Sequence, residues 1–174
     1  MFMPLIQKRR SIRKYEDRLI ESDKMELLIE AALRAPSSRG FDPWEFIIVT
    51  DKAILEKLSR AKPHGSSFLK GAAVGMVVIA DRDRSDVWIE DASIASIFVQ
   101  LAAHAIGLSS CWIQIRKRMY DDVTSAEAYV AGILNIPINL KVESIIAIGY
   151  PAETKAPHAK EKLKYHKIHY DFYG

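Results

Sequence analysis

The sequence holds a single cysteine, Cys111, among its 174 residues. One cysteine excludes an intrachain disulfide, and a zinc site would have to rest mainly on histidines and carboxylates. Ser110 and Trp112 flank Cys111 on an expected buried strand, so a packed and unreactive thiol is the favoured interpretation. A reducing cytoplasm suits this cysteine content best.

Glycine-rich phosphate-binding motifs are also lacking. The sequence has no Gly-x-Gly-x-x-Gly, no Gly-x-x-x-x-Gly-Lys-Ser/Thr and no Gly-x-Ser-x-Gly. These absences exclude a Rossmann fingerprint, a P-loop and a nucleophile elbow. His104 falls on an apolar helix, where a hydrogen-bonded core histidine is favoured over a ligand. The tail histidines His158, His166 and His169 lack the spacing to cysteine or carboxylate that favours metal, so no metal site is predicted.

The sequence also lacks a large excess of one charge and a long uninterrupted apolar run. The net charge of +3 is too small to predict a nucleic-acid partner. The longest apolar stretch, residues 89–106, contains Glu90, Asp91, Gln100 and His104, which predicts a buried helix rather than a membrane span. The cations near the N-terminus follow a very short apolar piece, which is the wrong order for a signal peptide.

What the sequence does contain is the composition of an ordinary globular domain. Hydrophobic residues make up 49% and charged residues 27%, which indicates neither disorder nor a fibrous class. A chain of this length buries close to ~70% of its unfolded surface when it folds. Residues 1–174 are therefore expected to form a single domain.

Helices and strands are expected to alternate along the chain. Helices are predicted over residues 3–9, from an N-cap at Ser22 to residue 35, after a cap at Asp51, and over 125–134. Strands are predicted over 45–49, 74–80, 110–115 and 143–148, and the unbroken apolar run 74–80 indicates a strand covered on both faces. This order favours a central sheet with helices on both faces.

The predicted helix over 89–106 and the tail after Gly149 both carry apolar surface that a second protein chain could cover. One helical face carries Ile94, Ile97 and Phe98, yet the other sides of the same helix are also apolar. A helix that is apolar all round needs something to cover it, and a partner subunit is one solution. The tail after Gly149 is too aromatic for a disordered segment, so it is expected to pack within its own subunit or on another.

The strongest functional signal is the cation cluster of residues 8–13, where Lys8, Arg9, Arg10 and Arg13 surround Ser11. Arginine presents a planar fork of donors that matches phosphate or carboxylate oxygens, although a solvated basic face is the alternative for such a run. Further lysines stand in the tail at 160 and 162, and the loop 36–44 holds two large aromatic residues. This set suits a ligand with a phosphate at one end and a flat apolar body at the other, such as flavin mononucleotide (FMN).

Four segments in series resemble the nitroreductase family of FMN-dependent enzymes. They are Arg-Arg-Ser-Ile-Arg at 9–13, the loop 35–38 leading to Pro-Trp-Glu-Phe at 43–46, Gly-Leu-Ser-Ser-Cys-Trp-Ile-Gln at 107–114, and Ile-Gly-Tyr-Pro-Ala at 148–152. The resemblance covers nearly the whole chain. It implies an α+β fold with a mixed central β-sheet flanked by helices, and an intertwined homodimer with FMN at the subunit interface.

The resemblance also implies which residues bind the flavin. Arg9, Arg10 and Ser11 would serve its phosphate, ribityl chain and ring edge, and Arg13 its pyrimidine side. Lys160 and Lys162 resemble the basic pair that completes the phosphate site. The loop residues Pro36, Ser37, Ser38 and Arg39 would come from the other subunit, and the backbone around Ile113 and Gln114 would line the ring. Gly40 and Asp42 replace amide residues common in the family, and Gln114-Ile115 replaces an acidic-glycine pair.

The function implied is an FMN-dependent oxidoreductase that takes hydride from NADH or NADPH and reduces nitroaromatics, quinones or similar small molecules in two steps. A cation beside the pyrimidine ring, assigned to Arg13, would stabilise the negative charge of the reduced flavin. Three alternatives stay open at the level of sequence. They are a flavin-binding protein without turnover, a relative with other flavin chemistry (dehalogenation, flavin breakdown or a non-nicotinamide donor), and a nucleic-acid contact at the basic cluster.

Overall fold

Four strands form one sheet in the order β1-β2-β4-β3, and each neighbouring pair runs antiparallel. The computed structural model describes residues 2–173. The strands are β1 (Trp44–Val49), β2 (Val74–Asp81), β3 (Ser109–Gln114) and β4 (Leu140–Gly149). A parallel bridge between Ser11 and Ser110 joins the N-terminal segment to the outer edge of β3. The predicted α+β fold with a central sheet is confirmed. The four strands are antiparallel, and the parallel contact is this isolated bridge outside them.

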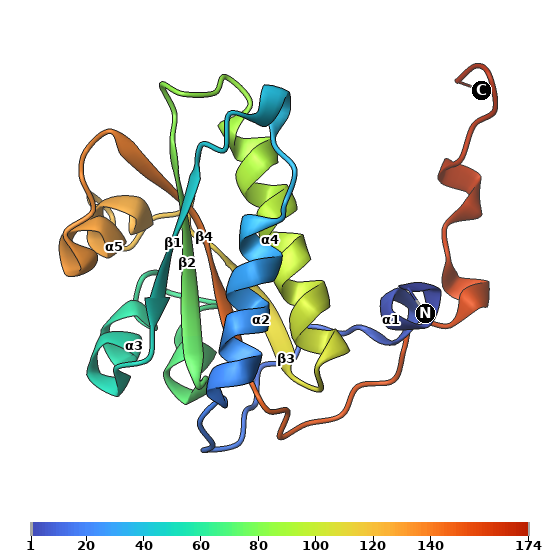
Figure 1. The fold of residues 1–174 in the computed structure, drawn as a ribbon, viewed down its shortest axis with the longest axis horizontal. Helices are drawn as coiled ribbons and strands as arrows, with labels where there is room; N and C mark the ends of the chain where they lie inside the picture. Colours follow the sequence, from blue (N-terminus) through green and yellow to red (C-terminus); the bar gives the residue numbers. More distant parts are fainter. Residues whose placement is uncertain (1, 174) are drawn as a thin grey trace.

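Helices cover both faces of the sheet (Figure 1). Helices α2 and α4 pack on one face, and α3 and α5 pack on the other. The helices are α1 (Phe2–Lys8), α2 (Ser22–Leu33), α3 (Lys52–Leu58), α4 (Trp88–Ala105) and α5 (Ala126–Leu134). Short 3₁₀ turns are η1 (Ser38–Gly40), η2 (Ser67–Gly71), η3 (Lys160–Lys162) and η4 (Tyr165–Lys167). Among residues 2–173, no helix is both long and apolar enough to cross a membrane.

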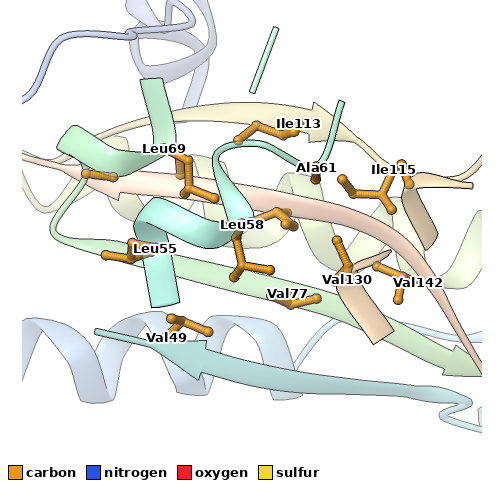
Figure 2. Packing of buried hydrophobic residues seen from close by; sticks show 14 of the residues in the cluster. Val49, Leu55, Leu58, Ala61, Leu69, Val77, Ile113, Ile115, Val130 and Val142 are labelled. Atoms are coloured by element: carbon orange, nitrogen blue, oxygen red, sulfur yellow. The ribbon is translucent and has the colours of Figure 1, made fainter. Parts of the chain in front are cut away.

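The core forms because the two central strands are apolar on both faces. Residues 74–80 of β2 are all buried, as the continuous apolar run predicted. Leu55 and Leu58 of α3 are fully buried against the sheet, in one cluster with Val77 and Ile113. Figure 2 shows Leu55 near Val49 and Leu58 near Val77. The Asp51 carboxylate accepts the backbone N–H of Ile54 at 2.9 Å, which confirms the predicted cap of α3.

The predicted cap of α2 is wrong by one residue. Glu21 occupies the N-cap position and Ser22 is the first helical residue, with no capping hydrogen bond from either side chain. The Glu21 carboxylate is instead held by the Tyr150 hydroxyl and by Arg18, and these bonds lower the pKa of Glu21 to about 2. The start of α2 is therefore tied to the end of β4, and a long-range contact takes the place of a local cap.

The long helix α4 buries its smaller side chains and exposes its larger ones. Ala92, Ala95 and Val99 are fully buried, whereas Ile94, Ile97 and Phe98 are each 38% exposed. Small side chains let α4 approach the sheet and α2 closely. The face of α4 with the larger apolar side chains is left uncovered within one chain.

The tail stays bonded to residues 10–16 as far as residue 156 and then leaves the body of the chain. Figure 1 shows it leaving the sheet after β4, passing beside α1 and extending outward. Tyr170, Phe172 and Tyr173 are between 85% and 93% exposed. Within one chain the tail therefore does not find the packing that its aromatic content predicts.

Candidate functional site

The cation segment 9–13 is held against the outer edge of β3. The Ile12 N–H donates to the Ser110 carbonyl at 3.2 Å, and the Ile12 side chain is only 6% exposed. Arg9 and Ser11 are partly buried, and Arg13 is exposed. Ile12 is therefore buried in the core, and the polar residues around it stay accessible.

The segment after β4 crosses the cation segment and fixes its backbone. Glu153 Oε1 accepts the backbone N–H of Arg13 at 2.7 Å, and Lys155 Nζ donates to the Ser11 carbonyl at 2.9 Å. Lys155 also pairs with Glu153 at 3.0 Å. The Arg13 N–H and Lys155 together hold the pKa of Glu153 below its usual range. Because only the backbone of Arg13 is used, its guanidinium remains available and lies 5.7 Å from the Phe68 ring centre.

Arg10 has a different role from its neighbours. Its guanidinium donates to the Ala156 carbonyl, so one of its nitrogens is already engaged with the chain that follows β4. Arg10 also borders a small hollow of about 200 Å³, which Lys8, His104 and Lys155 line as well. Burial lowers the pKa of His104, and the charges of Arg9 and Lys8 lower it further. A positive surface thus forms at the C-terminal end of α4, where an anion would be stabilised.

The open edge of β3 presents backbone groups beside this surface. Since the Ser110 carbonyl faces outward to Ile12, the backbone groups of Trp112 and Gln114 face the same edge. Ile113 points its backbone toward β4, and its side chain is fully buried. Of the predicted pair Ile113 and Gln114, the geometry therefore favours Gln114 as the outward amide.

The Gln114 side chain belongs to a hydrogen-bonded network that the sequence did not reveal. Its Oε1 accepts from Trp112 Nε1 at 2.9 Å, and its Nε2 donates to the Arg116 carbonyl at 3.0 Å. A longer contact of 3.5 Å joins Gln114 Nε2 to Glu143 Oε1. The signal for Glu143 in the sequence is an acidic residue just before the apolar run 145–148.

The loop 36–39 lies at the other end of α4. The Ser38 N–H donates to Asp91 Oδ1 at 2.8 Å in the first turn of that helix, whereas Arg9 lies near His104 in its last turn. A helix rises about 1.5 Å per residue, so these two places are about 20 Å apart. Pro36, Ser37, Ser38 and Arg39 are therefore not brought to the cation segment of their own chain.

Asp42 closes this loop. The Ser37 hydroxyl donates to Asp42 Oδ1 at 2.6 Å, and the Asp42 N–H donates back to Ser37 Oγ at 2.9 Å. Arg39 and Asp42 both adopt positive φ, 54° and 45°. Asp42, which departs from the family pattern, thus holds Ser37 in place. The backbone of this turn is strained at Arg39 and at Asp42.

Lys160 and Lys162 stand on η3, in the exposed tail. Lys160 lines a hollow with Met3 and Ile6 of α1, the helix that leads into Arg9. Lys162 is exposed on the same turn. The tail thus brings Lys160 next to α1, and the structure does not place Lys162 against the cation segment.

Cys111 lies behind the cation segment. Its side chain is 2% exposed, and burial raises the pKa of its thiol. A buried thiol with a raised pKa is a poor nucleophile. The interpretation of Cys111 as a packed thiol is confirmed.

Comparisons with known proteins agree on one family. The model of the nitroreductase family matches residues 6–63 and 60–150. The solved structure of an FMN-dependent nitroreductase from Clostridium difficile R20291 has a TM-score of 0.97 and 48% sequence identity, over 98% of this chain and 99% of that one. A protein of Archaeoglobus fulgidus named "Putative NADH dehydrogenase/NAD(P)H nitroreductase" is 36% identical over 88% of this chain and 87% of its own. A protein of Methanothermobacter thermautotrophicus with the same name is 35% identical over 94% and 83%.

Proposed function

The chain belongs to the nitroreductase family, and on that premise we propose that it is an FMN-dependent oxidoreductase using NADH or NADPH to reduce nitroaromatic, quinone or similar acceptors. The similar Clostridium difficile protein is FMN-dependent by name, and the Archaeoglobus fulgidus protein is named for NAD(P)H. The single observation that carries the proposal is the exposed Arg13, whose backbone is held by Glu153 and which follows Ile12 on the outer edge of β3.

The donor set fits FMN. Arg9, Arg10 and Ser11 offer charged and neutral donors for a phosphate and a ribityl chain, in the positive surface at the end of α4. The outward N–H of Gln114 offers a donor or close contact for a ring nitrogen. Lys160 and Lys162 would reach the phosphate from the tail. FMN, when bound, supplies the hydride chemistry.

The protein's own residues orient the reactants and stabilise charge. Arg13 places a cation where the reduced cofactor gains negative charge, which favours reduction. No protein acid or base is required for hydride transfer itself, so positioning and exclusion of water are the main tasks of the chain. The nicotinamide donor and the acceptor would bind one after the other at the same face of the flavin ring, which gives a two-step reaction.

A second copy of the chain would complete the site. The loop 36–39 lies about 20 Å from the cation segment of its own chain by the helix rise, so its contribution to the cofactor requires the partner's loop. The exposed face of α4 with Ile94, Ile97 and Phe98 supplies an apolar surface for that partner, and the aromatic tail supplies more. We therefore propose an intertwined homodimer as the active form.

The dimer can be tested at the centre of the exposed α4 face. Changing Ile97→Glu places a charge in the proposed interface, so we expect a monomer that has lost FMN, because charge burial at an apolar interface is strongly unfavourable. Sedimentation velocity and the ratio of flavin to protein absorbance measure both effects. Val123 is 88% exposed in a loop away from α4, and Val123→Glu serves as the matched control. An Ile97→Glu variant that stays dimeric contradicts this interface.

The activity is tested first by visible spectroscopy. The purified protein with added FMN is expected to retain a bound-flavin spectrum, and that spectrum is expected to bleach on anaerobic addition of NADH or NADPH. Consumption of the same donor with menadione or a nitroaromatic then measures turnover. Bound flavin without turnover would favour a flavin-binding protein or a different electron donor. A protein that neither retains FMN nor is reduced would refute the proposal.

A further inference from the structure

Glu143 is a carboxylic acid enclosed within the sheet. It is 3% exposed, and its Oε2 has no hydrogen-bond partner among the described residues. In β4, Val142 pairs with Ile79 and Ser144 pairs with Val78, so Glu143 is the extra residue of a β-bulge. Bulges redirect a side chain, often beside functional sites. An apolar residue would suit this position better, which makes the buried acid a feature to explain.

The charges around Glu143 come from every element that packs against it. Arg116, in the loop after β3, has its Nε 4.0 Å from Glu143 Oε2, beyond hydrogen-bond distance. Glu90 of α4 and Glu127 of α5 face it with like charge, and Glu127 is itself paired with Lys141 at 3.6 Å. Burial raises the pKa of Glu143, the two acids raise it further, and Gln114 and Arg116 oppose them.

Arg116 links Glu143 to the open edge of β3. The Arg116 carbonyl accepts from Gln114 Nε2 at 3.0 Å, and the Arg116 guanidinium lies 5.8 Å from the Trp88 ring centre. A negative charge on Glu143 would attract this guanidinium across the 4.0 Å gap, away from Trp88. Gln114 Nε2 lies 3.5 Å from Glu143 Oε1, so a negative charge on Glu143 would also attract the Gln114 side chain directly.

We propose that Glu143 is a positioning residue whose loss of a proton tightens its contacts with Arg116 and with the Gln114 side chain at the open edge of β3. The consequence for a cofactor rests on the proposed function, since the backbone N–H of Gln114 faces outward at that edge and its side chain belongs to this network. Flavin affinity and reduction potential then depend on pH through a group that does not touch the flavin. At low pH the neutral acid exerts little attraction on Arg116 and Gln114, and rising pH, which removes the proton, draws both groups closer to Glu143.

The network can be followed without flavin, because two of the three tryptophans lie in it. Trp112 Nε1 donates to Gln114, and Trp88 lies under Arg116. In a Trp44→Phe background, we expect the fluorescence of the flavin-free chain to change with pH in one transition. Adding Glu143→Gln or Glu143→Val should remove that transition, and Glu127→Gln should keep it. A transition unchanged by both Glu143 variants overturns the proposal.

The FMN-loaded protein supplies the second measurement. The midpoint potential of the parent is expected to show a break in its slope against pH at the same pH as the fluorescence transition, and Glu143→Gln should lose this break while Glu127→Gln keeps it. Equal slopes in the parent and Glu143→Gln would overturn the coupling to the cofactor site. A Glu143-dependent fluorescence transition in a protein that does not retain FMN would support the positioning role and refute only the proposed function.

Discussion

Replacing Arg13 with alanine is expected to weaken FMN binding about 10- to 100-fold, because a hydrogen bond to a charged group contributes about 1.5–3 kcal/mol. The reduced flavin should lose more affinity than the oxidised flavin, since in the proposed site Arg13 would face the charge that reduction creates. The midpoint potential of the variant should therefore fall. Alanine keeps the backbone N–H that donates to Glu153 at 2.7 Å, so the segment itself should stay in place.

Two further variants separate charge from bulk at Arg13. Arg13→Lys retains the cation and is expected to recover much of the potential but less of the affinity, because it loses the planar fork. Arg60→Ala removes another exposed arginine, which forms a surface ion pair with Glu56, and it should leave both quantities unchanged. Flavin fluorescence titration and a dye-coupled potential measurement give the two values. Identical potentials in Arg13→Ala and the parent would reject the assignment of Arg13 to the pyrimidine side.

Local patterns were enough to predict most of the sheet and its helices. The apolar run that predicts a strand over 74–80 corresponds to β2 (Val74–Asp81), and the cap at Asp51 starts α3 as expected. These elements depend on burial and on short-range hydrogen bonds, which the order of residues expresses directly. The Arg13 environment was less predictable, because Glu153 and Lys155 reach it from the other end of the chain.

Contacts between distant segments account for what the sequence did not predict. Every face of α4 is apolar, so periodicity could not tell that Ala92 packs inward and Ile97 outward. The N-cap at Glu21 depends on Tyr150, more than a hundred residues away. A β-bulge in β4 brings Glu143 to the Gln114 side chain. No pattern of residues in the sequence predicts where such a bulge shifts the register. The residues that tie the candidate site together are therefore the ones least visible in the sequence.

Gly149, the last residue of β4, illustrates how a distant contact supports the site. A methyl group at this position would lie 3.0 Å from Tyr15 Cδ1 and 3.3 Å from the backbone nitrogen of Ala73. The Tyr15 hydroxyl donates to the Ile12 carbonyl at 2.7 Å and to the Ala147 carbonyl at 3.3 Å. The glycine thus makes room for the ring that joins the cation segment to the sheet.

Gly149→Ala is expected to lower the free energy of unfolding by about 1–3 kcal/mol, the usual cost of overpacking, because the Ala73 backbone cannot move aside. Displacing the Tyr15 ring should also loosen Ile12 and weaken FMN binding, although no cofactor-binding residue is changed. Gly132→Ala is the matched control. Gly132 lies inside α5 with no atom within 4 Å of the added methyl, so alanine there should be neutral or stabilising by up to about 1 kcal/mol. Urea unfolding and FMN titration measure both effects. Since the two variants add the same methyl group, equal stabilities would mean that the Tyr15 ring yields freely and does not fix the cation segment.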